Sequence, residues 1–373
     1  MAAAPSTWSP PRPPTLEAPP TPRRIAGLDM ARALAILGMV MVHFGPFTPD
    51  TSNLLGRVYR MSYGRASVLF VLLAGVGVSL LFAARPATQA RIRIAWRVLV
   101  FFPVGVALQA LPTPVAVILQ FYALYYLLGG LVAGLATRWL AGLTAIWTIA
   151  GPLLFLTLVD SDLTVRGTAA DLSDPVGLAS DLLLTGYYPL ITWAPSLLVG
   201  VLVGRADLRD RVSVWALSLG GVVVAVAAYG GSELARMLAP SASHSPYLLA
   251  EGHSGAPLNV VGSTAVAVAV LGLCLLLTAA LPRLTWPFVA VGQMALTVYV
   301  LHLLVLAWQP DWLEGGQSVV DAVGKIGRFY LVTTLMCMAW RARFRQGPLE
   351  ALLALPFRFA RPVPPAPTLD DRA

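Results

Sequence analysis

Residues 27–46 read GLDMARALAILGMVMVHFGP and form the first long apolar segment of the chain. At 100° per residue, the eleven steps from Arg32 to His43 return to within about 20° of the starting direction, and Asp29 lies one turn before Arg32. The pattern therefore predicts a helix on which an acid, a guanidinium and an imidazole share one face. Ionisable side chains within a membrane segment are costly and usually face a bundle interior or a wet cavity. We interpret this face as the leading candidate for an active site.

The composition indicates that most of the chain lies in a membrane. Hydrophobic residues make up 57% of the 373 residues and charged residues only 12%, with a mean hydropathy of +0.73. A soluble domain carries about a quarter charged residues, and several runs here approach or exceed the roughly 20 apolar residues that cross a bilayer. The composition predicts an all-α, polytopic helical membrane protein with the lipid bilayer as its first partner.

The net charge of +8 does not indicate nucleic-acid binding. Basic residues gather in short loops and tails, as membrane topology requires, and the sequence shows no aromatic-basic nucleic-acid module. Cys274 and Cys337 both lie inside apolar segments, where thiols behave as small hydrophobic groups. We therefore expect no disulfide framework, no metal site and no nucleic-acid partner.

Hydropathy divides the chain into three parts. Residues 1–24 are rich in Pro, Ala and Ser and predict a disordered cytosolic tail, whereas residues 25–345 form the membrane domain. Residues 346–373 predict a second cytosolic tail, with an interfacial amphipathic segment at 349–360. The membrane domain is predicted to hold about ten spans, near 28–45, 65–84, 95–111, 114–135, 139–159, 187–204, 212–230, 257–281, 286–307 and 318–340.

The distribution of arginines predicts that both termini are cytosolic. Clusters of arginine flank two connections on the N-terminal side, at 85–97 and 205–211, and follow the last span at 341–345. The long connections 46–64, 160–186 and 231–256 carry few positive charges. With this topology Arg32 lies near the cytosolic face, and His43, about 16 Å further along the helix, reaches the outer leaflet. Polar and aromatic residues of other spans are also expected in outer halves and predict one water-accessible vestibule; they are Gln109, Gln120, Tyr122, Tyr187, Trp193 and His302.

The first span resembles the opening of transmembrane acyltransferases. The matching string is R-x₄-D-x₂-R-x₂-A followed by a histidine, at Arg24, Asp29, Arg32, Ala35 and His43. The acyltransferase-3 family carries an Arg-x₁₀-His pattern there, and the heparan-α-glucosaminide N-acetyltransferase family opens similarly. The stretches at 65–81, 118–128 and 286–304 also resemble these families, the last two being most similar to the second family and its bacterial relatives of unknown function.

One departure bears on the histidine. In the sugar N-acetyltransferases the active histidine follows the first span in a loop, but residues 44–64 contain no histidine here. The resemblance therefore implies that His43 supplies the base, as in the acyltransferase-3 pattern, or that the chain is a diverged, non-catalytic relative. It also implies acetyl-coenzyme A or another acyl-coenzyme A as a donor substrate, without a bound cofactor.

Acyl transfer needs a base, dipoles or cations for the thioester oxyanion, and positive charge for the donor's phosphates. His43 suits the first role because imidazole titrates near neutral pH, and the alternative is an interfacial histidine beside Gly45. His302 is a second catalytic candidate, with a hydrogen-bonded bundle histidine as the alternative. Asp29 and Arg32 are read either as an i,i+3 ion pair or as donor-binding residues.

The remaining donor-site candidates come from other spans. They are Gln120, Tyr122, Lys325 and Arg328, and the last two share a face with Asp321. Arg328 is expected deep in its segment, where it could reach an anionic group, and Lys325 is alternatively read as an interfacial lysine. The arginines at 91, 93 and 97 could dock nucleotide phosphates, but membrane topology already explains them. His244, Glu251 and His253 are possible metal ligands without a recognised spacing, and we read them as parts of a solvated loop.

Two hypotheses follow. The first is a membrane acyltransferase that passes an acyl group, acetyl by the resemblance, from coenzyme A to a hydroxyl or amine of a glycan or lipid-linked envelope molecule, in a bacterial plasma membrane. The second is a non-enzymatic membrane protein, either a transporter or a lipid-binding component. A transporter would often show an internal repeat, and the two halves of this chain show none. Neither hypothesis predicts an oligomeric state.

Overall fold

The regular structure of the chain is helical throughout the part that the computed structural model describes. The described residues are 24–46, 52–159, 167–238, 246–248, 250, 252–311 and 319–357. Several predicted features lie outside the described residues. They are residues 1–23 of the tail predicted at 1–24, residues 358–360 at the end of the interfacial segment, and the loop residues His244 and Glu251.

Each of the ten predicted spans contains a helix. These helices are α1 (Ala26–Phe44), α3 (Arg65–Ala83), α4 (Ala87–Gln109), α5 (Leu119–Val132), α6 (Thr137–Val159), α8 (Leu190–Val203), α9 (Arg211–Leu238), α10 (Pro257–Ala280), the pair α11 (Pro282–Gly292) and α12 (Ala295–Trp308), and α14 (Val319–Arg343). Shorter elements join them: α2 (Leu54–Arg60), α7 (Pro175–Ser180), the π-helical turn η1 (Asp181–Thr185), the 3₁₀ turn η3 (Pro246–Leu248), α15 (Pro348–Ala354) and the 3₁₀ turn η4 (Leu355–Phe357).

The structure confirms an all-helical, multi-pass membrane protein, with fewer uninterrupted spans than the ten expected. Among the described residues, six helices are long and apolar enough to cross a membrane, or up to eight when each of two bent pairs is counted as one span. The span predicted at 286–307 is one of these pairs, because α11 and α12 meet at 64°. The span predicted at 114–135 is shorter than expected, because residues 114–118 are not helical and α5 has only 14 residues.

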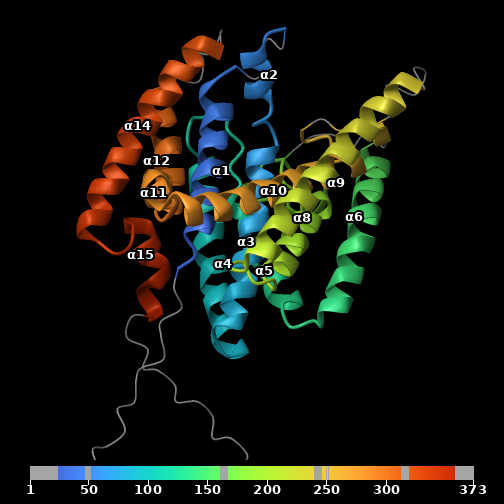
Figure 1. Ribbon diagram of the computed structural model, residues 1–373, viewed down its shortest axis with the longest axis horizontal. Helices are drawn as coiled ribbons and strands as arrows, with labels where there is room; N and C mark the ends of the chain where they lie inside the picture. The colour runs from blue at the N-terminus through green and yellow to red at the C-terminus, as the bar shows by residue number, and fades with distance from the viewer. Residues whose placement is uncertain are drawn as a thin grey trace, which may run out of the picture.

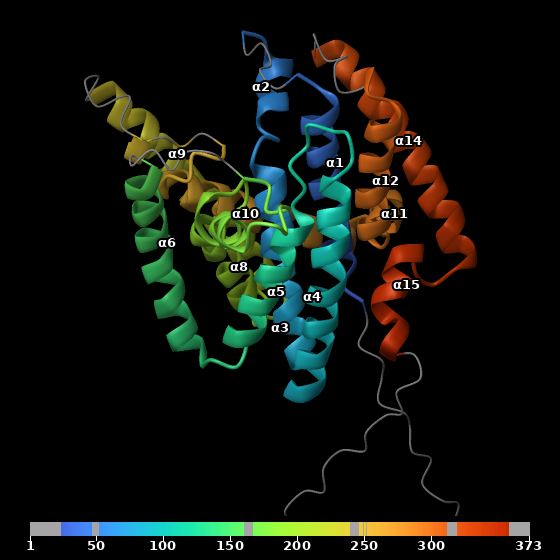
Figure 2. The ribbon, with the colours of Figure 1, turned by 180° about the vertical axis from the view of Figure 1, so that it is seen from behind.

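Helix α1 lies at the centre of the molecule and packs against α3, α10, α11, α12 and α14. In Figure 1, α14 forms one flank, while α6 and α9 lie on the opposite side. The alanines on α1 at positions 31, 33 and 35 are fully buried, which lets neighbouring helices approach closely. The view from behind shows α4 and α5 covering this face of the bundle, and α15 turned toward the end where the chain enters α1 (Figure 2).

The flanking helices expose apolar side chains, as expected for surfaces that face lipid tails. The large exposed residues include Trp139, Ile146 and Ile149 on α6, Val222, Val223 and Val226 on α9, and Leu331, Val332 and Leu335 on α14. The buried polar residues instead lie between the helices, and the buried ionisable ones among them include Asp29, His43 and His302. The bilayer therefore places the chemistry of the protein in its interior.

Candidate active site

The first element of the site is an ion cluster at the start of α1. The carboxylate of Asp29 is buried and accepts hydrogen bonds from two arginines, with 2.6 and 3.0 Å from Arg24 Nε and Nη2 and 2.7 Å from Arg32 Nη1. The arginine side chains keep 52% and 29% of their surface exposed. The expected Asp29–Arg32 pair is therefore present, but Arg24 shares it. One carboxylate opposite two guanidiniums leaves a surplus of positive charge there.

The bend between α11 and α12 lies directly against this cluster. A Cβ atom at Gly292, the last residue of α11, would overlap the backbone carbonyl oxygen of Asp29. Only glycine allows the two backbones to approach this closely. The bend is thus held beside the acid, and α12 starts three residues later with its side chains turned toward α1.

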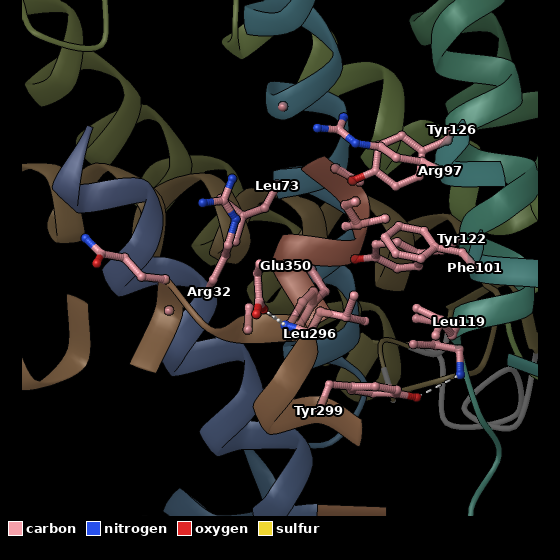
Figure 3. Close-up of a pocket in the computed structure, with 18 of the residues that line it drawn as sticks. Arg32, Leu73, Arg97, Phe101, Leu119, Tyr122, Tyr126, Leu296, Tyr299 and Glu350 are labelled. Carbon is pink, nitrogen blue, oxygen red and sulfur yellow. Dashed lines mark hydrogen bonds between the residues drawn. The ribbon is translucent and has the colours of Figure 1, made fainter. Parts of the chain in front are cut away.

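A pocket of about 250 Å³ opens beside the arginines. Figure 3 shows Arg32 on one wall, with Arg97 and the rings of Phe101, Tyr122 and Tyr126 on another. The Arg97 guanidinium lies 5.2 Å from the centre of the Tyr126 ring, a cation–π distance. The rest of the wall is mainly apolar and also includes three polar residues, Arg24, Gln293 and Glu350. The other lining residues are Met39, Phe70, Leu73, Ala74, Gly77, Ile118, Leu119, Gly292, Ala295, Leu296, Tyr299 and Leu353.

Two polar atoms of the pocket residues have no hydrogen-bond partner among the described residues. These are the hydroxyl oxygen of Tyr122 and the side-chain oxygen Oε1 of Gln293. Both side chains are more than nine-tenths buried. Burying a polar atom without a partner costs about 1–3 kcal/mol, so such atoms are uncommon and usually have a functional reason.

The C-terminal segment closes one side of the pocket. Glu350 of α15 accepts hydrogen bonds from the backbone N–H groups of Leu296 (2.7 Å) and Thr297 (3.2 Å) and from the Thr297 hydroxyl (2.7 Å). A carboxylate at this position satisfies free N–H groups at the start of α12 and is favoured by the helix dipole. On the other side, Trp96 of α4 donates to the Leu352 carbonyl. Helix α15 therefore bridges α12 and α4 beside the pocket.

A pair of histidines lies at the opposite end of α1. Nδ1 of His43 and Nε2 of His302 are 3.0 Å apart, and the rings are parallel to within 11°. Both side chains are buried. Neither histidine lines the pocket. Tyr299 does line it, and the centre of its ring lies 5.1 Å from the centre of the His302 ring. Tyr299 is thus the contact between the pocket and the histidine pair.

The other predicted residues lie elsewhere. Gln120 donates to the Thr168 carbonyl (2.6 Å) and is buried outside the pocket wall. Arg328 is exposed, not deep in its segment, and donates to Gly324 of its own helix, while Lys325 donates to the Asp311 carbonyl. These three residues do not join Arg32 and Tyr122.

The predicted single vestibule is also not found. Tyr187 and Trp193 line a separate cavity of about 30 Å³ with His253, and Gln109 is bound to the backbone of Val115 and Val117. Tyr122 and Arg32, both predicted as donor-site residues, do line one pocket. Tyr122 lies in the first turns of α5, which packs against α3, α4 and α8.

Sequence reasoning missed several pocket residues. Arg97 was assigned to membrane topology alone, and Gln293 and Tyr299 lie in an apolar run without a distinguishing pattern. Glu350 carried a usable signal, because it is the only acid in the apolar stretch 349–360. Arg24 was part of the first-span motif but was given no role.

Two family models match the chain. One, described as heparan-alpha-glucosaminide N-acetyltransferase, catalytic, covers residues 24–238, and the other, described as a protein of unknown function (DUF418), covers residues 206–355. No curated protein gives a significant match. The first match starts at Arg24 and includes the ion cluster, His43 and the aromatic wall on α4 and α5. Because it covers more than half of the chain, the protein belongs to the family of heparan-alpha-glucosaminide N-acetyltransferase catalytic domains.

Proposed function

We propose that the protein transfers an acetyl group from acetyl-coenzyme A to a hydroxyl or amine of a glycan or lipid-linked envelope molecule. The family match supports acetyl transfer in a membrane. The observation that carries the proposal is the order of groups along α1. Arginines surround a pocket near its start, and a histidine pair lies near its end, with Tyr299 in contact with both the pocket and the pair.

The arginine end suits the donor. Coenzyme A carries phosphates at one end and a thioester at the end of a long, thin arm. Guanidinium groups bind phosphate oxygens through charge-assisted, often bidentate hydrogen bonds. Arg24, Arg32 and Arg97 all line the pocket, and only Glu350 among its lining residues carries a negative charge. The pocket beyond them is walled by apolar and aromatic groups, which suit the arm.

The histidine end suits proton transfer. In the proposed step the acceptor's O–H or N–H gives its proton to His43 as the acceptor attacks the thioester carbonyl carbon. The carbon–sulfur bond then breaks, and the proton passes to the departing thiolate, so that free coenzyme A and the acetylated acceptor result. Nδ1 of His43 lies 3.0 Å from Nε2 of His302. In the tautomer that we propose, Nδ1 of His43 donates its N–H to Nε2 of His302, so that Nε2 of His43 keeps a lone pair and His302 acts as a positioning residue.

We assign the Tyr299 hydroxyl to stabilising the oxyanion that forms on the thioester carbonyl. Its hydroxyl oxygen already accepts the backbone N–H of Ile118 (3.2 Å), so its own hydrogen is directed elsewhere. A hydroxyl in a pocket wall beside His302, the partner of the base, is placed to donate to the thioester oxygen as negative charge develops there.

The proposed side of the membrane for the acceptor and the proposed compartment rest on the topology predicted from the arginine distribution. With both termini in the cytosol, the arginine end faces the coenzyme A pool and the histidine end faces outward, in a bacterial plasma membrane. We also propose that residues 25–345 form the catalytic membrane domain, flanked by cytosolic tails.

The experiment is transfer of labelled acetyl groups by purified protein reconstituted in lipid. Wild-type protein is incubated with labelled acetyl-coenzyme A and an envelope extract, and label in the glycan and lipid fractions is counted. We expect transfer, and we expect His43→Ala to lower its rate by about 10² to 10⁴-fold.

A matched variant separates a catalytic loss from a general one. His253→Asn changes a histidine that lines the separate small cavity, and asparagine tolerates the left-handed backbone (φ 62°) found there. It should retain wild-type transfer. Unchanged transfer in His43→Ala would contradict the catalytic role, and folded wild-type protein that transfers nothing to any fraction would favour a non-enzymatic relative.

A further inference from the structure

The pocket offers two hydrogen-bonding atoms that the protein itself does not use. The hydroxyl of Tyr122 on α5 and Oε1 of Gln293, in the bend between α11 and α12, come from separate elements and have no hydrogen-bond partner in the described part of the chain. Both residues line the same pocket. A hydroxyl donates or accepts, and an amide oxygen accepts.

The surroundings of these atoms limit the ligand. Phe70, Phe101 and Tyr126 pack edge-on around the Tyr122 ring, so the wall on this side of the pocket is aromatic. The matching ligand segment is narrow and mainly apolar, with a carbonyl that accepts from the hydroxyl and an N–H that donates to the amide oxygen. Secondary amides joined by short methylene links have this chemistry.

We infer that Tyr122 and Gln293 bind the amide groups of the pantetheine arm of the donor. The inference rests on the proposed function and refines it, because the arm carries amides and methylenes and extends from the phosphates toward the thioester. The arginines that would bind the phosphates line the same pocket. Tyr299 also lines it and contacts His302. The hydroxyl of Tyr122 and Oε1 of Gln293 thus belong to the same pocket as the residues proposed to bind the phosphate end and the thioester end of the donor.

Access requires only side-chain movement. Both atoms are buried in this structure, and the wall of the pocket includes the flexible side chains of Met39, Leu296 and Leu353, whose rotation would open it. Rotation of such side chains on ligand binding is common, whereas backbone shifts are much less so. Figure 3 shows Leu296 near the centre of the pocket, between the Tyr122 and Tyr299 side chains.

The test measures binding rather than turnover. Titration calorimetry is carried out on reconstituted wild-type, Tyr122→Phe and Gln293→Met protein with coenzyme A, with pantetheine, and with the nucleotide half of coenzyme A alone. Each variant should bind coenzyme A and pantetheine about 3- to 15-fold more weakly, the loss for one neutral hydrogen bond. Affinity for the nucleotide half should stay at the wild-type value.

Tyr125→Phe is the matched control. Tyr125 is also buried on α5, and its ring packs on that of Tyr122, but its hydroxyl donates to the Tyr188 carbonyl at 2.6 Å. Tyr125→Phe should therefore lower the unfolding temperature and leave coenzyme A affinity unchanged. Tyr122→Phe should instead lower coenzyme A affinity without lowering the unfolding temperature, because removing an unpartnered buried hydroxyl does not destabilise the protein.

The outcomes are distinguishable. Unchanged coenzyme A affinity in both variants would overturn the inference and leave the proposed function standing. Equal losses for coenzyme A and the nucleotide half would also overturn it, since they indicate a distorted pocket. Wild-type protein that binds no coenzyme A would instead contradict the proposed function.

Discussion

His43 and His302 are separated by 259 residues in the chain, yet Nδ1 of the first lies 3.0 Å from Nε2 of the second. The contact joins the end of α1 to the third turn of α12. One ring must donate and the other accept, so each histidine sets the tautomer of its partner. The pair is therefore a unit rather than two independent candidates.

The first prediction concerns this unit. His302→Phe keeps a ring of similar size but removes the hydrogen bond to His43. A hydrogen bond to a group that becomes charged is worth about 1.5–3 kcal/mol, so acetyl transfer should slow by about 10- to 100-fold, less than in His43→Ala. Initial rates at saturating acetyl-coenzyme A test this. A loss in His302→Phe equal to or greater than that in His43→Ala would make His302 the base.

The second prediction separates donor binding from ion pairing at Arg32. Arg32→Lys keeps the charge but loses the planar fork, so coenzyme A affinity should fall. Asp29→Asn should instead act on stability, by about 2–3 kcal/mol, because the buried carboxylate accepts three charge-assisted hydrogen bonds. Calorimetric titration with coenzyme A and thermal unfolding are measured on both variants. Wild-type affinity in Arg32→Lys would leave Arg32 a purely structural partner.

The third prediction concerns the bend over the ion cluster. Gly292→Ala places a methyl group on the Asp29 carbonyl, which backbone atoms cannot avoid by rotation. Overpacking of this kind costs about 1–3 kcal/mol or more, so the variant should unfold at a lower temperature. Gly142→Ala in α6 is the control, since no atom lies within 4 Å of the added Cβ and alanine favours a helix. Equal unfolding temperatures in the two variants would contradict the close approach.

The fourth prediction concerns the anchor of α15. Glu350→Ala removes the acceptor for two backbone N–H groups and one hydroxyl at the start of α12. Loss of a helix cap costs about 0.5–2 kcal/mol, and the unfolding temperature in detergent should fall accordingly. Leu352→Ala, on the same helix but more than a third exposed, should change it less. A larger effect of the leucine would show that apolar packing, not the carboxylate, holds α15.

The fifth prediction is the topology. Tyr247→Cys places a thiol in the connection 231–256, which we expect outside, and Thr88→Cys places one at the exposed start of α4, expected inside. Both native cysteines are buried, so the background should be low. An impermeant thiol reagent added to intact cells should label the first variant and spare the second. The reverse pattern would invert the map.

Much of this architecture is readable from local pattern. Hydropathy identified a helical membrane protein, and a helix lies within each predicted span, because an apolar run in lipid must satisfy its own backbone hydrogen bonds. Helical periodicity placed Asp29, Arg32 and His43 on one face, and all three side chains are directed inward, with Arg32 only partly exposed. These properties depend on residues close together in the chain.

The partners on that face were decided by tertiary structure. Periodicity sets the direction of a side chain around its own helix, but not the tilt, depth or neighbours of that helix. Arg24 joins Arg32 in pairing with Asp29, and the chain bends by 64° between α11 and α12, the latter of which packs against α1. The packing of α5 against α3 and α4 places Tyr122 in the pocket wall. Glu350 and His302 reach the site from more than 250 residues further along the chain. Such long-range contacts depend on how whole helices pack, and no local pattern encodes that packing.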